Sequence, residues 1–337
     1  LNSYNLNFFI RLIVLNLFTF SLNAQHSLRK LPYPINTNYH NEVSPVFSID
    51  GDNLIFTRIG SLDYNKTLVI DGVDIFTTFD QETYLNKLTE VFNQISNYQI
   101  VDPIPSSFNQ DVYVATMEND KITEVIHPGY PLNNALPNSI CSTFGEGNDE
   151  YLLLNEFSTN GSMVEGFSTV SLNKNVNSSF PKPIKIIDFK HTGQNINASI
   201  SIDKQHLFLS MYNVESGNKD IYLSIKINDT TYAKPKLIET INSGYEEITP
   251  YIVKDKSKLY FSSNRPGGLG EYDIYYVERL DYSYLNWSSP KTFLSPLNTI
   301  HSESYPCLLN EDIFFTSDRD GTSDIFKVKT KRIDDSN

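Results

Sequence analysis

A phrase of strand, turn and strand recurs along this chain and constrains its fold more than any other feature. Clear copies lie at Leu259–Val277 and Ile313–Val328, and fainter copies lie at Leu54–Phe76 and Leu207–Leu223. Each copy reads as an apolar strand, a turn that contains Gly or Asn, and a second strand that begins with Asp-Ile-aromatic. A strand-built repeat of about 50 residues is typical of a β-propeller. The repeat therefore predicts an all-β fold, although propellers serve many functions.

A second phrase, Pro-hydrophobe-Asn followed by Glu and Pro, sets the number of units. It is clear at Tyr33–Pro45, Ile241–Pro250 and Ser295–Pro306 and degenerate elsewhere. Counting from its copies gives six units, which start near residues 40, 94, 134, 191, 242 and 298. We therefore expect a six-bladed β-propeller in which each blade is a four-stranded antiparallel sheet.

The last unit needs a strand from the other end of the chain. Its third strand ends near Thr330, while residues 27–36 resemble the strand that precedes the second phrase in Ser288–Asn298. We expect residues 27–36 to complete the last blade, because closure removes unpaired strand edges that promote aggregation. The expected propeller spans residues 25–332, and residues 333–337 form a short tail.

The strands themselves fit stacked blades. The second strand of each clear unit is a short apolar run, as in Leu259–Phe261 and Ile313–Phe315. A strand that is apolar on both faces requires cover on both faces, which neighbouring blades provide. Helical periodicity is scarce, and Tyr84–Gln94 is the one stretch in which we expect a short helix.

The N-terminus reads as an export signal rather than as structure. Phe8–Leu22 is apolar apart from a few polar residues, including Arg11, and a small residue, Ala24, suits cleavage before Gln25. This apolar core is shorter than the roughly 20 residues that a membrane-spanning helix needs. We therefore expect residues 1–24 to be a signal peptide and the mature chain to be periplasmic or secreted, without a membrane span.

Charge and cysteine content exclude several partners and cofactors. The chain has 27 Lys and Arg against 40 Asp and Glu, a net charge of −13. Nucleic acids and anionic lipids bind clustered cations, so neither is an expected partner. Cys141 and Cys307 would begin blades three and six, on opposite sides of a six-fold ring, so we expect free buried thiols. No cofactor is expected.

A family resemblance is carried by three of the six units. The residues that carry it are Pro45, Ser48, Asp50, Gly51, Leu54, Phe56 and Asp74 in the first unit, Pro250, Leu259, Phe261, Arg265, Gly267, Gly268, Asp273, Ile274 and Tyr275 in the fifth, and Pro306, Phe315, Arg319, Gly321, Asp324 and Ile325 in the sixth. This pattern resembles the TolB-type propeller repeat, especially the version in exported Bacteroidota proteins that often carry an OmpA-like domain. The resemblance implies a periplasmic or surface propeller that binds protein partners and has no catalytic residues.

Paired charges recur where the innermost strands begin. The repeats place three glutamates beside three arginines, namely Glu42, Glu247 and Glu303 beside Arg58, Arg265 and Arg319. One interpretation is structural ion pairs, which contribute little stability when they are exposed. The other is a charged rim at the channel mouth that binds a partner peptide.

The repeated acids and histidines admit further interpretations. The aspartates of the Asp-Ile-aromatic phrase follow a turn, where a carboxylate can accept backbone N–H groups, so we expect structural roles for Asp74, Asp220, Asp273 and Asp324. The His-x-Glu pairs His40–Glu42 and His301–Glu303 are weak candidates for a transition-metal site. Copying of the repeat explains the same pairs, so the expectation is no metal.

Together these features favour an exported, non-catalytic propeller that acts as a protein-interaction scaffold at the cell envelope. Its partner would be an envelope or secreted protein or peptide, which we expect to contact Asp63–Gly72, Asn155–Val164 and the divergent region Ile100–Pro137. The sequence contains no G-x-S-x-G elbow and no phosphate-binding loop. The alternative is a glycan-binding or glycan-cleaving propeller, a hydrolase or lyase, with its site in the central funnel.

Overall fold

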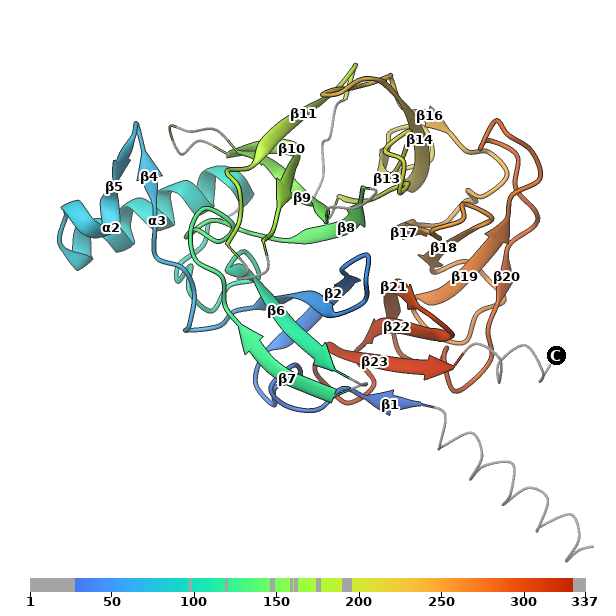
Figure 1. The fold of residues 1–337 in the computed structure, drawn as a ribbon, viewed down its shortest axis with the longest axis horizontal. Helices are drawn as coiled ribbons and strands as arrows, with labels where there is room; N and C mark the ends of the chain where they lie inside the picture. The colour runs from blue at the N-terminus through green and yellow to red at the C-terminus, as the bar shows by residue number, and fades with distance from the viewer. Residues whose placement is uncertain are drawn as a thin grey trace, which may run out of the picture.

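The described strands form a ring of sheets around a central axis (Figure 1). The computed structural model describes residues 28–329 except 97–98, 119–120, 146–148, 158–159, 161–162, 174–176 and 190–195. The expected signal peptide, residues 1–24, and the expected tail, residues 333–337, lie outside the described residues. In the described part of the chain, no helix is both long and apolar enough to cross a membrane.

Five units, named blades I to V in chain order, make up the ring in the described residues. Blade I contains β2 (Asn41–Phe47), β3 (Asn53–Ile59), β6 (Gln110–Glu118) and β7 (Lys121–Ile126). Blade II contains β8 (Ile140–Phe144), β9 (Glu150–Phe157), β10 (Met163–Ser171) and β11 (Lys182–Ile186). Blade III contains β12 (Asn197–Ile200), β13 (His206–Asn213), β14 (Asn218–Asn228) and β16 (Lys236–Leu237). A short strand, β15 (Thr231–Tyr232), bridges β14 to β11, so blades II and III share one sheet.

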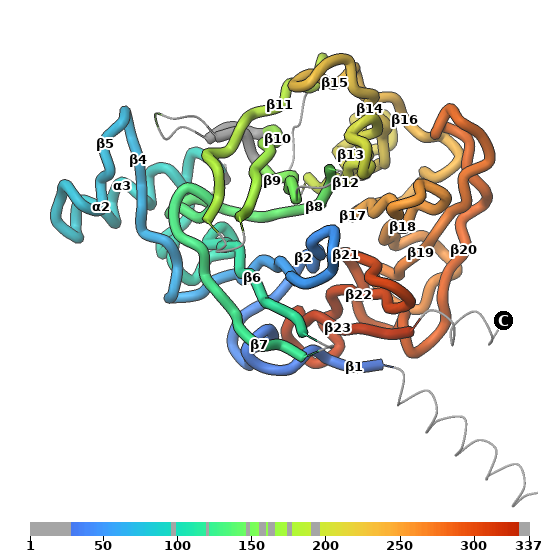
Figure 2. The backbone as a smooth tube through the Cα atoms, in the orientation of Figure 1, coloured from blue at the N-terminus to red at the C-terminus, as the bar shows by residue number. Residues whose placement is uncertain are grey.

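The ring closes through blades IV and V. Blade IV contains β17 (Glu247–Ile252), β18 (Lys258–Ser263), β19 (Asp273–Glu278) and β20 (Lys291–Thr292). Blade V contains β21 (Glu303–Leu309), β22 (Asp312–Ser317), β23 (Asp324–Lys329) and β1 (Arg29–Lys30). In this sheet β1 pairs antiparallel with β23, with Arg29 opposite Lys327, so both ends of the described chain lie in one blade (Figure 2).

The prediction of six blades is wrong, because the unit expected near residue 94 is not a blade. Residues 60–109 are an insertion between the second and third strands of blade I. It contains β4 (Val69–Ile70), β5 (Val73–Asp74), α2 (Ile75–Thr78) and α3 (Gln81–Ser96) and projects to one side of the ring (Figure 1). The predicted helix at Tyr84–Gln94 is confirmed within α3. Its Tyr84, Leu88 and Phe92, spaced by four residues on one helical face, bury into a core that the insertion forms together with Ala135 and Leu136.

Each face of a blade packs on its neighbour. Among the described residues, five hydrophobic clusters each join two adjacent blades around the ring. Their members include Val114 and Leu153 between blades I and II, Phe144 and Leu207 between II and III, Phe208 and Phe261 between III and IV, Ile274 and Phe315 between IV and V, and Phe314 and Phe56 between V and I. Neighbouring residues of one strand, such as Phe314 and Phe315, bury on opposite faces, which explains the apolar runs in the sequence.

An asparagine, which we call the linking Asn, ties each described blade junction except that between blades II and III; it is half-buried at Asn242 and buried at the other three junctions. Asn298 accepts the N–H of Ile274 at 2.9 Å and donates to the carbonyl of the same residue at 3.0 Å. Equivalent pairs of bonds join Asn36 to Ile325, Asn133 to Val112 and Asn242 to Ile221. The Asn of the second repeated phrase therefore satisfies the backbone of the preceding blade, as buried polar groups require.

Candidate functional site

The three predicted Glu–Arg pairs form, but their carboxylates are inside the protein. Glu303 accepts from the backbone N–H and the hydroxyl of Thr299, both at 2.8 Å, from Ser317 Oγ at 2.8 Å and from Arg319 Nη2 at 2.9 Å. Thr37 and Ser243 replace Thr299 around Glu42 and Glu247. All three glutamates are 0% exposed.

These clamps correct the expectation of a charged, partner-binding rim. A fully buried carboxylate cannot contact a partner, and the arginines are also engaged, since Arg319 donates to the carbonyls of Pro296 and Leu297. Arg265 pairs with Glu247 at 2.8 Å, and Arg58 pairs with Glu42 at the same distance. Burial raises the pKa of Glu42. The clamps hold the starts of β2, β17 and β21 against their own blades.

The predicted structural aspartates occupy two kinds of site. Asp273 accepts the N–H groups of Leu269 and Gly270, at 2.7 and 3.1 Å, in the turn before its strand. Asp220 and Asp324 lie at the same repeat position but accept from side chains. Asp74 does not belong to the repeat, because it caps α2 and accepts from Phe76 N. In blade I the insertion moves this repeat position to Asp111. The triplet Asp-Val-Tyr that begins there follows the same pattern as Asp-Ile-aromatic.

The candidate metal ligands do not gather. No group of three or more His, Cys, Asp or Glu side chains that could hold a metal ion exists among the described residues. Glu42 and Glu303 form ion pairs with Arg58 and Arg319. His301 Nδ1 lies 3.8 Å from Asp318 Oδ1. Cys141 and Cys307 are free and buried, which confirms that prediction. Burial raises the pKa of each thiol to about 12.

The loops expected to bind a partner are only partly described. Asp63–Gly72 opens the insertion, and Ile100–Pro137 runs from its end through β6 and β7 to the start of blade II. Asn155–Val164 falls partly outside the described residues.

A central cavity of about 730 Å³, which we call the funnel, lies where the inner strands meet. Residues of β2, β8, β12, β17 and β21 line it, together with the turns that follow several of these strands. Its wall combines tyrosine rings with hydroxyl and amide groups, contributed by Tyr251, Tyr260, Tyr305, Ser48, Ser142, Thr143, Thr249, Asn197 and Asn310. The funnel is therefore both aromatic and rich in hydrogen-bonding groups.

Three inner strands bulge at the same place in the funnel wall. Ser44, Thr249 and Tyr305 have φ values of 56°, 50° and 53°, and each precedes a proline. The strand pairing shifts register at each of these residues. A non-glycine residue in this conformation costs on the order of 1–3 kcal/mol, and such strain concentrates at functional sites. The recurring x-Pro of the sequence repeat is thus a bulge that faces the cavity.

Two carboxylates, Asp50 and Asp255, occur among the described residues that line the funnel. Asp255 accepts from the N–H and the hydroxyl of Ser257, at 2.9 and 2.6 Å, and these bonds lower its pKa. Asp50 accepts from Ser48 Oγ at 2.6 Å and from Asp52 N at 3.0 Å. Both carboxylates thus sit in turns whose hydrogen bonds orient Oδ1.

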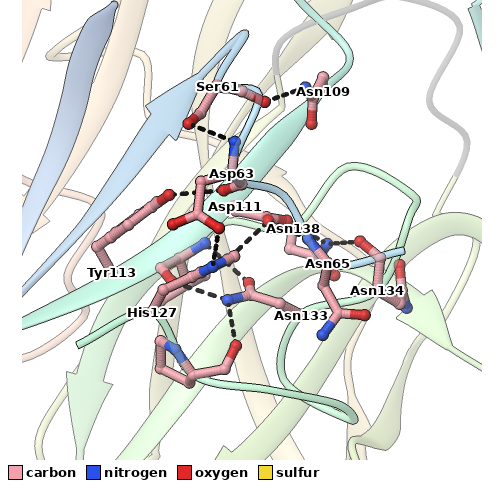
Figure 3. Close-up of polar contacts among 12 residues, drawn as sticks. Ser61, Asp63, Asn65, Asn109, Asp111, Tyr113, His127, Asn133, Asn134 and Asn138 are labelled. Atoms are coloured by element: carbon pink, nitrogen blue, oxygen red, sulfur yellow. Dashed lines mark hydrogen bonds and ion pairs between the residues drawn. The ribbon is translucent and has the colours of Figure 1, made fainter. Parts of the chain in front are cut away.

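A polar cluster at the junction of blades I and II was missed by the sequence analysis (Figure 3). His127 Nε2 lies 2.7 Å from Asp111 Oδ2, and His127 Nδ1 lies 3.9 Å from Asp63 Oδ1. The imidazole stacks on Tyr113, with ring centroids 4.6 Å apart. The available signal was the Asp-Val-Tyr triplet at Asp111, which is a variant of the repeated Asp-Ile-aromatic phrase.

No protein-family model matches this chain, and no curated protein sequence matches it. Similar solved structures include TolB from Acinetobacter baumannii, at 11% identity over 88% of this chain and 56% of that chain, with a TM-score of 0.40. This chain thus spans about half the length of that structure. A structure described as a glycoside hydrolase matches at 11% identity over 92% and 94% of the two chains, with a TM-score of 0.49. An alpha-L-arabinofuranosidase from Lactobacillus brevis matches at 10% identity over 91% and 93%, with a TM-score of 0.46.

These findings correct the expected function. Several of the similar solved structures are described as glycoside hydrolases or glycosidases, which contradicts the expectation of a non-catalytic interaction scaffold and of a chain that is not an enzyme. A propeller-type fold is common to this chain, TolB and these enzymes. The TM-scores are below 0.5, so the likeness assigns neither a substrate nor a residue's role.

Proposed function

We propose that this chain is a glycan-cleaving propeller that holds its saccharide in the funnel. The observation that carries the proposal is the funnel wall, which contains the half-buried Tyr251 and Tyr305 together with hydroxyl and amide groups. A sugar ring has apolar C–H faces that pack on aromatic rings and hydroxyls that need hydrogen-bond partners. A preformed concave site with a few placed polar groups is the usual form of a small-ligand site.

The funnel also supplies a pair of carboxyl groups. Glycoside hydrolysis commonly uses two such groups, one as an acid and the other as a base or nucleophile. Asp255 suits the base or nucleophile, because the Ser257 hydrogen bonds lower its pKa and keep it ionised at neutral pH. Asp50 is the second carboxyl group in the wall. We also propose that the chain is exported to the periplasm or beyond, because residues 1–24 read as a signal peptide.

The test is a cleavage assay on the purified chain. The chain is incubated with a panel of neutral and acidic polysaccharides, and released reducing ends are measured for the wild type and for Asp50→Asn and Asp255→Asn. Each substitution should lower the cleavage rate by about 100-fold or more, as expected for the loss of an acid or base. A double bond conjugated to the product's carboxylate would identify a lyase instead of a hydrolase.

The chain offers a matched control for this assay. Asp281 accepts from the N–H and hydroxyl of Ser283 at 2.8 and 2.6 Å, the same turn as that of Asp255, but it does not line the funnel. Asp281→Asn should leave cleavage unchanged. The proposal is overturned if no polysaccharide is cleaved, or if the funnel variants cleave as fast as the control.

A further inference from the structure

At the junction between blades I and II, the sequence departs from the blade repeat at three places. In blades IV and V a glutamate follows the linking Asn by five residues, whereas Asn138 stands at this spacing in blade II. Six residues before the linking Asn, blades IV and V have Thr292 and Lys30, whereas blade I has His127. The insertion replaces a short turn in the same blade. When residues that differ from their equivalents in the other repeats lie close together in space, the difference indicates a local function.

These departures build one network (Figure 3). Asp111 is 2% exposed, and its carboxylate is bonded by Asn65 N at 2.7 Å, Asn138 Nδ2 at 3.3 Å and His127 Nε2 at 2.7 Å. Asn65 comes from the insertion and Asn138 from blade II, so three parts of the chain fix this one carboxylate. In blade V the equivalent pair, Lys30 and Asp324, is an ordinary ion pair at 2.6 Å.

The buried carboxylate orients the His127 ring and selects its tautomer. Since an ionised carboxylate can only accept, the 2.7 Å bond to Asp111 favours the tautomer with the proton on Nε2, in which Nδ1 carries the lone pair. Stacking on Tyr113 fixes the plane of the ring. Nδ1 therefore faces Asp63 as an oriented hydrogen-bond acceptor.

Two acceptors thus stand side by side at the surface. The Asp63 side chain is 83% exposed, that of His127 is 17% exposed, and 3.9 Å separates Asp63 Oδ1 from His127 Nδ1. At this distance they do not bond to each other. A third acceptor of the cluster, Asn138 Oδ1, is buried and has no hydrogen-bond partner among the described residues. A ligand that fits this pair must bring two hydrogen-bond donors.

Apolar groups flank the acceptor pair along the chain. Leu62 precedes Asp63, and Tyr130 follows His127 by three residues; both are exposed. An acceptor pair with exposed apolar residues next to it in the sequence suits a ligand with adjacent donors and an apolar face. The neighbouring hydroxyls of a sugar ring are about one hydrogen-bond length apart, and the ring's C–H face is apolar.

We propose that His127 and Asp63 form a second saccharide site, outside the funnel, that binds two vicinal hydroxyls of a sugar ring. One hydroxyl donates to His127 Nδ1 and its neighbour donates to Asp63. Asp111 acts as a positioning residue, because its bond to Nε2 orients the ring and selects the tautomer in which Nδ1 accepts. The inference rests on the proposed glycan function and extends it, because a site outside the funnel would hold a distant part of the same chain.

The test is a titration of the histidine ring resonances by NMR in the full chain. The chain has six histidines, and the spectrum of His127→Gln identifies the signal of His127. The probe is a methyl pyranoside with a vicinal diol, and its fully O-methylated form is the ligand control. The diol should shift the His127 signal, and the methylated form, which lacks donors, should not.

Two variants, each of which neutralises one exposed carboxylate, test the role of Asp63. Asp63→Asn should weaken the diol's effect by about 10-fold, because a charge-assisted hydrogen bond is lost. Asp320→Asn should not, since Asp320 lies 3.4 Å from Lys30 at the equivalent place in blade V. Both variants should fold, because both side chains are exposed.

The outcomes separate this inference from the proposed function. Cleavage in the funnel without a diol-dependent shift of His127 overturns the inference and leaves the function standing. A stronger shift with ethylenediammonium than with the pyranoside also overturns it, because the pair would then be a cation site. If no glycan is bound or cleaved anywhere, the proposed function fails and the inference fails with it.

Discussion

Removing one clamp carboxylate tests whether the repeated Glu–Arg pairs are structural. The substitution is Glu303→Ala, and its control is Glu278→Ala. Glu278 also pairs with a cation, Lys291, at 2.8 Å, but both side chains are about half exposed. The two variants therefore remove the same kind of ion pair from a buried and from an exposed place.

The expected magnitudes follow from burial. Glu303→Ala removes the acceptor of Thr299, Ser317 and Arg319 and leaves the guanidinium without its counter-ion in a nearly closed site. Breaking a buried pair by removing one partner costs about 3–5 kcal/mol of unfolding free energy. An exposed pair contributes about 0–1 kcal/mol. The difference between the variants should therefore be about 2–5 kcal/mol.

Urea unfolding, followed by circular dichroism and tyrosine fluorescence, measures this difference. Both probes should give one transition for each variant, with the midpoint of Glu303→Ala far below that of Glu278→Ala. Equal midpoints would refute the reasoning, because the clamp would then add no more than a surface pair. A Glu303→Ala chain as stable as the wild type would also mean that the buried carboxylate does not stabilise the fold at this position.

Three further predictions concern the thiols, acid stability and the insertion. Cys141 and Cys307 should react with a thiol reagent far more slowly in the folded chain than in urea, because burial raises their pKa to about 12; fast native reaction would contradict their burial. Burial alone would raise the pKa of Asp203, but hydrogen bonds, first from Lys256, lower it to about 2. The stability from this carboxylate is therefore present above its unfolded pKa of about 3.9 and is lost as the pH falls toward 2. The stability gap between the wild type and Asp203→Asn should close over that range, and a constant gap would contradict the assignment. Replacing residues 61–108 by a short Gly-containing turn should remove the helical signal in circular dichroism and keep the β-sheet signal; loss of both would show that the ring needs the insertion.

The sequence repeat predicted the propeller architecture but not the number of blades. Apolar runs such as Ile313–Phe315 require cover on both faces, which is why a propeller could be predicted from them. The count failed because Asp74-Ile75-Phe76 imitates the start of a third strand, although these residues begin α2. The true third strand starts one residue before Asp111, after an insertion whose length no local pattern revealed.

The candidate sites were less predictable, because they depend on packing between distant segments. The pairing of glutamates with arginines could be read from repeat positions, but their complete burial depends on Thr299 and its equivalents folding over them. The funnel bulges appear in the sequence only as an x-Pro step. His127 gave no signal alone, since its partners Asp63, Asp111 and Asn138 come from an insertion, a strand and the next blade.

Hydrogen exchange of the chain with and without a saturating oligosaccharide tests the central claim most directly. If the saccharide lies in the funnel, exchange should slow in the turns at residues 48–52 and 253–257, which carry Asp50 and Asp255. Protection confined to other parts of the ring, or no protection by any glycan, would contradict a saccharide site in the funnel.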